Sequence, residues 1–381
     1  MQLTTYRYYG ACAPGLETSI AEILKERFPD LALPLLLSGA IVFETAASYD
    51  RLNLFCFNNI FRVISDTTNN GQSGQKTMET FVRNVLNRGI GREILAEGKG
   101  KSPPPFRVVF SRENIPAAVD EGLRQDTEHY IASLSGLKVD RSNPGVEFWF
   151  LLRREGAFFM KRLSRHPTWD KTLHPGELPP PLAWMLCKLA ERSIAAEQSA
   201  AAERSTAAEP RHGERVADPF CGYGAIPAAQ LRHFPPVEFF ASDIDAKALA
   251  YSKNKFKGKT ASSPKHNCHF NRVDARELAR IIPPHSLDRI ITDPPWGLYE
   301  GTAKTASTTP IGEFYGECLK VFAGLLKPGG TAVILCGRGE AADGLKAAAE
   351  QNNFTVIRSI PILVSGKKAT IFLLQARYKI T

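Results

Sequence analysis

Between residues 215 and 336 the chain repeats a short apolar run, a turn rich in glycine or proline, and a stretch with helical spacing. Short apolar runs predict buried strands, and their alternation with helices predicts a parallel sheet covered by helices on both faces. Two later apolar runs, separated by residues 365–368, predict a hairpin at one edge of this sheet. The predicted strands are 215–217, 239–242, 271–273, 289–292 and 331–336, followed by the hairpin 355–361 and 369–376.

The preceding part of the chain has mixed patterns typical of small α+β units. Predicted strands lie at 6–9, 35–37, 40–43, 62–65 and 106–110, with a hairpin formed by 146–152 and 157–162. Predicted helices lie at 16–28, 49–56, 77–88, 117–134 and 182–194. We therefore expect a small α+β domain over 1–66, a second over 67–165, a helical linker over 166–213 and an α/β domain over 214–381.

Composition narrows the functional classes. The 381 residues are 43% hydrophobic and 23% charged, which is ordinary for a globular protein and excludes wholesale disorder. No apolar run approaches the roughly 18 to 20 residues that a membrane span needs, and the first ten residues do not resemble a secretion signal. Seven scattered cysteines without a CxxC pair favour reduced thiols and no metal site. We expect a cytoplasmic protein without a membrane segment.

The net charge of +9 permits attraction to a polyphosphate without proving it. Positive charge is concentrated between residues 153 and 171, where six basic side chains face only two acidic ones, Glu155 and Asp170. These six, called the basic strip below, are Arg153, Arg154, Lys161, Arg162, Arg165 and Lys171. They predict a phosphate-facing surface that binds RNA. The alternative is a solvated hairpin edge that positive charge keeps from pairing with other chains.

Residues with possible ligand chemistry follow the first three predicted strands of the α/β domain. In open α/β sheets, ligands bind beyond the carboxyl ends of the strands. Asp218 follows the first strand, and Gly222 and Gly224 let backbone and helix-start amides approach a ligand. Asp243 follows the second strand, where an acid can accept hydrogen bonds from ribose hydroxyls. Asp274 follows the third and can bond an exocyclic amine, although a helix cap is the alternative role for it, and the favoured one for the nearby Asp245.

The fourth predicted strand runs directly into Asp293-Pro294-Pro295-Trp296. Two prolines stiffen this exit and remove two amide donors. The Asp293 carboxylate and the Pro294 carbonyl then form a fixed pair of acceptors, and Trp296 offers a flat face for a stacked base. This set suits methylation of an amino group on a heteroaromatic ring, because acceptors offset the charge that develops on the attacking nitrogen. The alternative is a proline-stopped strand followed by a buried tryptophan.

The four segments 218–227, 242–245, 273–275 and 292–297, in this order, resemble those of class I S-adenosylmethionine-dependent amino-methyltransferases. Among these, the chain is most similar to the THUMP-domain RNA methyltransferases. Further matching segments are 13–17, 106–108, 143–146 and 173–178. The resemblance implies a ferredoxin-like domain over 1–66 and a THUMP RNA-binding domain over 67–165. A Rossmann-like methyltransferase domain with a C-terminal antiparallel hairpin would follow over 214–381.

The same resemblance implies S-adenosylmethionine as cofactor and assigns roles to the strand-end residues. Asp218, Gly222 and Gly224 would hold its methionine part, Asp243 its ribose and Asp274 its adenine. The neighbouring side chains that would complete this site are Phe220, Ile244 and Ala275. Asp293, Pro294, Pro295 and Trp296 would hold the target base.

The implied reaction is methylation of guanosine N2 in RNA, with tRNA as the expected substrate, by a monomer that needs no metal. Three positions depart from the family pattern: Tyr223 replaces a small residue, Ala229 a glutamate, and Leu298 a basic residue. Alternatives are a ribosomal RNA guanine N2 methyltransferase, an enzyme that acts on adenine N6 or cytosine N4, and a noncatalytic RNA-binding protein with the same fold. A nicotinamide dehydrogenase is disfavoured, because the first turn lacks the GxGxxG spacing.

Overall fold

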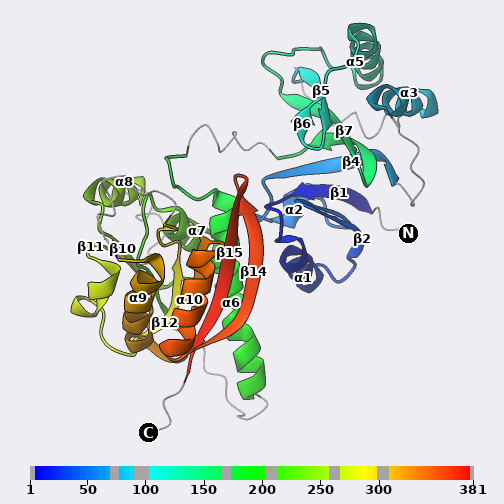
Figure 1. Cartoon of the computed structure of the whole chain (residues 1–381). Coiled ribbons are helices and arrows are strands. Elements are labelled where there is room, and N and C mark those ends of the chain that lie inside the picture. Colours follow the sequence, from blue (N-terminus) through cyan, green and yellow to red (C-terminus); the bar gives the residue numbers. More distant parts are fainter. Residues whose placement is uncertain are drawn as a thin grey trace. The chain divides into compact units, whose positions relative to one another are not determined.

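The computed structural model describes residues 5–68, 77–89, 103–164, 173–202, 213–256, 267–297 and 309–377 (Figure 1). Residues 71–74 lie outside these ranges, and so do most of residues 97–105; the glycine-rich and proline-rich sequence of these two segments predicts loops. The chain forms two compact units. The first contains Met1–Cys12 and Glu17–Pro167, and the second contains Ala13–Leu16 and Thr168–Thr381. Each unit is built on a sheet of its own.

A single eight-stranded sheet runs through the first unit. Its strands are β1 (Tyr6–Ala11), β2 (Ala32–Leu37), β3 (Ala40–Thr45), β4 (Asn59–Thr68), β5 (Phe106–Arg112), β6 (Ile115–Pro116), β7 (Val146–Arg153) and β8 (Gly156–Arg162). Their order is β2-β3-β1-β4-β8-β7-β5-β6. The helices are α1 (Glu17–Arg27), α2 (Tyr49–Leu52), α3 (Met78–Arg88) and α5 (Glu121–Ser135). Strands of both expected N-terminal domains therefore share one sheet, which is continuous through the pairing of β4 with β8.

Strand β8 is buried on both faces because it lies in the middle of this sheet. Successive side chains of a strand point to opposite faces. Phe158 and Met160 accordingly enter one core cluster together with Tyr9, while Phe159 enters another together with Phe81 of α3. Two cores thus meet across β8, and its side chains have little access to solvent.

The second unit contains a seven-stranded sheet in the order β11-β10-β9-β12-β13-β15-β14. The strands are β9 (Arg215–Asp218), β10 (Glu238–Asp243), β11 (Asn267–Arg272), β12 (Leu287–Thr292), β13 (Leu326–Gly337), β14 (Phe354–Val364) and β15 (Lys367–Ala376). The first five are parallel, and β15 runs antiparallel to both β13 and β14. Parallel strands and an edge hairpin therefore occur where the apolar runs predict them.

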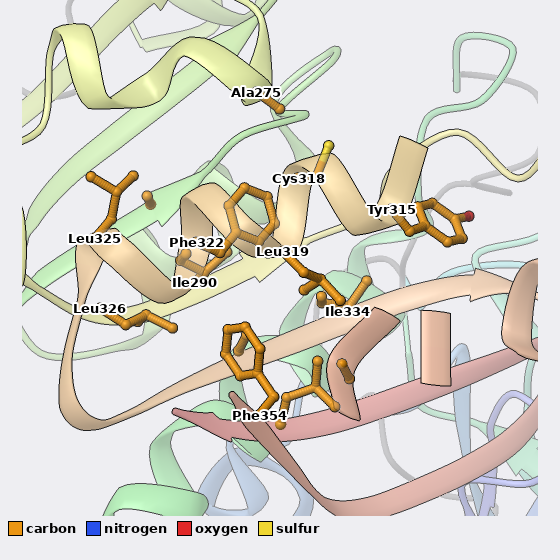
Figure 2. Packing of buried hydrophobic residues seen from close by; sticks show 14 of the residues in the cluster. Ala275, Ile290, Tyr315, Cys318, Leu319, Phe322, Leu325, Leu326, Ile334 and Phe354 are labelled. Atoms are coloured by element: carbon orange, nitrogen blue, oxygen red, sulfur yellow. The ribbon is translucent and has the colours of Figure 1, made fainter. Parts of the chain in front are cut away.

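Helices cover both faces of this sheet, as the alternating pattern predicts. They are α6 (Pro180–Ala202), α7 (Ala225–His233), α8 (Ala246–Phe256), the 3-10 helix η2 (Ala275–Arg280), α9 (Ile311–Leu325) and α10 (Glu340–Gln351). Figure 2 shows Leu319 and Phe322 of α9 in one buried cluster with Ile334 of β13 and Phe354 of β14. Val333, the neighbour of Ile334 in β13, points to the opposite face, and α6 packs against this strand. Helix α6 is longer than the predicted helix at 182–194.

Within the described ranges, no helix is long and apolar enough to span a bilayer. Nor do three or more His, Cys, Asp or Glu side chains gather there in a group that could hold a metal ion. All seven cysteines are free thiols, and six of them are buried. Their role visible in the structure is packing.

Candidate active site

The carboxyl ends of β9, β10 and β12 meet where the strand order of the second sheet reverses. Strand β9 lies between β10 and β12, with Asp218 paired in register with Ala241, and Ala217 with Ile290. In open α/β sheets, such a reversal leaves a crevice at the strand ends, because the connections leave in opposite directions. The residues that follow these three strands therefore lie close together.

Asp218 is fully buried at this reversal. Its Oδ1 accepts hydrogen bonds from the Thr292 hydroxyl at 2.8 Å and from the Phe220 amide at 3.2 Å. Its Oδ2 has no hydrogen-bond partner among the described residues. Burial raises the pKa of this carboxyl well above its ordinary value, and the nearby Asp243 and Asp293 raise it further. A positively charged ligand would relieve this repulsion and satisfy the orphaned oxygen.

Residues 218–224, called the glycine loop below, connect β9 to α7. Gly224 has φ +85° at the N-cap of α7, and a Cβ there would collide with the Ser252 hydroxyl of α8. Gly222 has φ +48°, and a Cβ there would meet no atom within 4 Å. Both glycines are therefore required for backbone conformation, but only Gly222 borders open space that a ligand can approach.

Asp243 joins the ends of β9 and β10. One of its oxygens accepts the Gly222 amide at 2.7 Å, and the other accepts the Asp245 amide at 2.8 Å. Each carboxylate oxygen has capacity for a second donor, so ribose hydroxyls can still bind to Asp243. Asp245 receives the Lys247 amide at 2.9 Å at the start of α8, which confirms its interpretation as a helix cap.

Asp274 is the N-cap of η2 and also forms an ion pair. Its Oδ1 accepts the Arg276 amide at 2.9 Å, and its Oδ2 lies 2.8 Å from Nη2 of the Arg276 guanidinium. Hydrogen bonds from Arg276 lower the pKa of Asp274. Asp274 therefore has the alternative role of helix cap. An adenine amine that bound here would share the carboxylate with Arg276. An open pocket of about 380 Å³ is lined by Asp274, Arg276, Glu277, Glu317 and Lys320.

The three apolar residues expected at the cofactor site lie in different environments. Ile244 directly follows β10 and is 59% exposed, so it can form an apolar wall for a planar ring. Phe220 is half-buried and its ring meets Phe314 edge-on at 5.9 Å between centroids. Ala275 is buried beneath the start of η2. Ile244 is thus the most accessible of the three.

The segment Asp293-Pro294-Pro295-Trp296 forms a braced turn after β12. The Trp296 indole nitrogen donates to Asp293 Oδ1 at 2.8 Å, and the Tyr315 hydroxyl donates to the Pro295 carbonyl at 2.7 Å. Figure 2 shows Tyr315 at the end of the buried cluster of α9. Burial raises the pKa of Asp293 to about 7, and the indole hydrogen bond partly opposes this shift. The turn is therefore rigid, and it carries a carboxyl group that titrates near neutral pH.

Two features of this turn are not visible in the sequence pattern. Trp296 is partly exposed, and its indole nitrogen donates a hydrogen bond to Asp293. The sequence predicts only that the indole lies beside this carboxylate. Its Cβ also lies over Gly337 at the end of β13, where an added Cβ would be only 3.2 Å away. Pro294 is buried and Pro295 is exposed. The carboxylate and the indole thus act as one hydrogen-bonded group at the strand end.

Of the four basic-strip residues that the structure describes, two are buried. Arg153 is 6% exposed and donates to the Tyr9 hydroxyl at 3.0 Å and to the Ser38 carbonyl at 2.9 Å. Lys161 is also 6% exposed. Lys161 lies in β8, whose two faces are covered by the two core clusters, and Arg153, the last residue of β7, packs against Tyr9 and Ser38. Arg153 and Lys161 therefore belong to the interior of the first unit.

The remaining four residues of the strip are placed differently. Arg162 is half-buried and forms an ion pair with Glu147 at 3.0 Å. Arg154, in the turn between β7 and β8, is the exposed member among those described. Arg165 and Lys171 lie outside the described residues. The expectation of one continuous strip is thus wrong for Arg153 and Lys161.

Comparison with known proteins finds similarity to methyltransferases. Residues 199–360 match the family model described as RMKL-like, methyltransferase domain. TrmN from Thermus thermophilus superposes with a TM-score of 0.71 at 23% identity, over 97% of this chain and 99% of that one. A possible methylase from Clostridium difficile 630 gives a TM-score of 0.67 at 12% identity, over 99% and 100%. The fold is that of a Rossmann-like methyltransferase.

A curated relative matches a shorter part of the chain. It is ribosomal RNA small subunit methyltransferase C of Hahella chejuensis, 30% identical over 127 residues. This segment is 33% of the present chain and 32% of the relative, so the match spans about a third of that protein. The expectation of S-adenosylmethionine as cofactor agrees with the match to a methyltransferase domain. The orphaned Asp218 oxygen and the open space at Gly222 fit such a cationic ligand.

Sequence reasoning missed the residues that support the site. Thr292 holds Asp218, Tyr315 holds the turn after β12, and Gly337 makes room for Trp296. Of these three residues, only Thr292 could have been recognised from the sequence, because it is a polar residue at the end of an apolar strand and precedes Asp293. Of the three departures from the family pattern, Ala229 is buried in α7, and Leu298 lies outside the described residues.

Proposed function

We propose that this chain is an S-adenosylmethionine-dependent RNA methyltransferase that methylates the exocyclic N2 amine of a guanosine, with tRNA as substrate. One observation carries the proposal: the braced turn of Asp293 and Trp296 lies at the same strand ends as the buried, half-satisfied Asp218. An acceptor for an amine and a carboxyl group that a cation would stabilise are thus adjacent. The resemblance to THUMP-domain enzymes supplies the choice of guanosine and tRNA.

The proposed binding of the donor uses complementary charge. Asp243 and Asp293 raise the pKa of Asp218, so negative charge is concentrated at these strand ends, and a cation beside Asp218 and Asp243 would be stabilised there. S-adenosylmethionine, when bound, supplies a methyl group on a positively charged sulfur. Asp218 would accept from its ammonium group at the free Oδ2, and Asp243 would accept from its ribose hydroxyls.

At the acceptor side, the chain's own groups hold the target amine. Asp293 Oδ1 is already bonded to the Trp296 indole, so Oδ2 is the oxygen proposed to accept an amine hydrogen. The Pro294 carbonyl would accept the second. These bonds orient the nitrogen lone pair and offset the positive charge that develops on nitrogen as it attacks. The proton that the nitrogen releases would pass to Asp293 or to water.

A methylation assay tests the proposal on the full chain. Transcripts of tRNA and of small-subunit ribosomal RNA are incubated with the protein and methyl-labelled S-adenosylmethionine, digested to nucleosides and analysed by mass spectrometry. We expect N2-methylguanosine from tRNA. Label in N6-methyladenosine or N4-methylcytidine would contradict the guanosine assignment, and label in ribosomal RNA alone would contradict the tRNA assignment. Comparison of modified nucleosides from a knockout strain and its parent identifies the physiological RNA.

The variant Asp293→Ala separates chemistry from donor binding. We expect it to abolish methyl transfer, because the amine loses its charged acceptor, and to retain the affinity for S-adenosylmethionine in calorimetry. Retained turnover would remove Asp293 from the catalytic role. A wild-type chain that binds RNA but no S-adenosylmethionine would instead support the noncatalytic RNA-binding alternative.

A further inference from the structure

Residues 173–178, called the strap below, lie against the glycine loop within the second unit. The His174 ring stacks on Tyr223 with 4.2 Å between ring centroids and an interplanar angle of 8°. Tyr251 of α8 meets His174 edge-on at 4.4 Å and Tyr223 edge-on at 5.6 Å. Tyr223 is thus held between the strap and α8. It is the residue that stands between the two left-handed glycines, Gly222 and Gly224.

The strap is itself anchored to α8. Glu177, whose side chain is 4% exposed, forms an ion pair with Lys255 at 2.7 Å. The other oxygen of Glu177 accepts the His174 amide at 3.1 Å, and Leu178 is buried. A nearly buried ion pair and a local hydrogen bond therefore fix the backbone at His174. The imidazole has a defined position over Tyr223.

The far side of the glycine loop is fixed by the same helix. A Cβ at Gly224 would collide with Ser252 and contact Phe256, both in α8. The Gly222 amide is held by Asp243. The Gly224 amide donates to the Cys221 carbonyl at 2.8 Å. Because glycine backbones have the largest conformational freedom to lose when they become ordered, the stacked ring of Tyr223 is a side-chain contact that adds to these backbone bonds.

We propose that His174 is a positioning residue for the methyl donor: its stack on Tyr223 holds the glycine loop in the shape that binds the donor. This inference rests on the proposed function, and it identifies a residue that the strand-end motifs do not contain. Pre-ordering the loop removes an entropic cost that the donor would otherwise meet on binding. The stack lies at the edge of the site, with Tyr251 41% exposed, so its loss affects the loop more than the core.

The experiment compares four full-length proteins by calorimetry with S-adenosylmethionine and with S-adenosylhomocysteine, and by thermal unfolding. They are the wild type, His174→Ala, His174→Phe and the matched control His269→Ala. His269 also stacks on an aromatic ring, that of Phe240, at 4.9 Å and 22°, but in β11 away from the glycine loop. Its removal tests the loss of an equivalent imidazole stack in the same unit.

We expect His174→Ala to raise the Kd of both ligands about tenfold, equivalent to about 1.4 kcal/mol. His174→Phe should restore most of the affinity, since it keeps the stacked ring, and His269→Ala should bind as the wild type does. In the methylation assay, His174→Ala should raise KM for the donor and leave kcat at saturating donor within about twofold, because His174 does not touch the target amine.

Unchanged donor Kd in His174→Ala would overturn the proposal, and so would a lower unfolding temperature without an affinity change. Equal affinity losses in His174→Ala and His269→Ala would also overturn it, because they would reflect general destabilisation. Should His174→Ala fail to fold, Tyr223→Leu takes its place and the same tenfold loss is expected. A wild-type protein that binds neither ligand would instead refute the proposed function.

Discussion

At the scale of single residues, Asp293 predicts how catalysis depends on pH. Burial raises its pKa to about 7, so below that pH the carboxyl carries a proton and loses part of its capacity to accept from an amine. We expect kcat/KM to rise with pH through about 7, since this parameter reports the free enzyme. Asp293→Asn keeps a neutral acceptor and does not titrate. We expect it to be about 10² to 10³ slower and to lack this rise.

Initial rates between pH 5.5 and 8.5 measure both profiles. An identical rise in wild type and Asp293→Asn would assign the titration to another group.

Replacement of Asp218 by asparagine is expected to raise stability and to lower the affinity for the methyl donor. Because its pKa is raised in the folded state, the folded protein binds the proton more tightly than the unfolded chain. Its contribution to stability is therefore fully present at low pH and is lost as pH rises from about 4 towards the folded-state pKa. Asp218→Asn removes this loss. We expect the variant to gain stability relative to wild type as pH increases from 5 to 8.

Urea unfolding at four pH values measures this difference between the two proteins. The same variant should lose affinity for the donor, because a neutral amide cannot offset an ammonium charge. A stability difference that is constant with pH would show that Asp218 does not titrate in this range.

At the scale of elements, the sequence was sufficient for the second sheet but not for the way the first sheet is assembled. The runs at 289–292 and 331–336 were predicted as strands, and β12 and β13 contain them, because parallel strands buried on both faces are nearly continuously apolar. The pairing of β4 with β8 joins segments about 100 residues apart, and no local pattern encodes it. Lys161 is buried in β8, and Arg153, the last residue of β7, is buried against Tyr9 and Ser38. The error about the basic strip therefore follows from contacts between segments that are distant in the sequence.

The glycine loop gives a prediction at this scale, since its two glycines differ in their surroundings. Gly224→Ala places a Cβ against Ser252 and also strains φ, so we expect a loss of about 2 to 4 kcal/mol in stability. Gly222→Ala meets open space and should cost only about 1 to 2 kcal/mol, the strain of a left-handed alanine. If the donor occupies that space, Gly222→Ala should nevertheless lose donor affinity.

Thermal unfolding and calorimetry of both variants separate these effects. The space at Gly222 would not be the donor's if Gly222→Ala bound S-adenosylmethionine as tightly as the wild type. Equal destabilisation of the two variants would contradict the clash at Ser252.

At the scale of the whole molecule, the net charge is +9, but two of the residues expected to contact RNA, Arg153 and Lys161, are buried. Attraction to RNA needs exposed cations, and a buried guanidinium such as that of Arg153 cannot release counterions from a phosphate chain. Arg153 instead stabilises the first unit through Tyr9 and Ser38. Arg154, in the adjacent turn, is exposed.

Salt dependence distinguishes the two arginines. If the chain binds tRNA through several phosphates, affinity should fall steeply between 50 and 200 mM salt, by about 10³ for six contacts. Arg154→Ala should reduce the slope of log K against log salt by about 1, the value for one lost phosphate contact. Arg153→Met should lower the unfolding temperature and leave the slope unchanged, because its charge faces the interior. Filter binding across salt concentrations measures the slopes. A slope near zero in the wild type would mean that electrostatic attraction does not drive RNA binding. A reduced slope in a folded Arg153→Met would mean that the Arg153 side chain leaves its buried position when RNA binds.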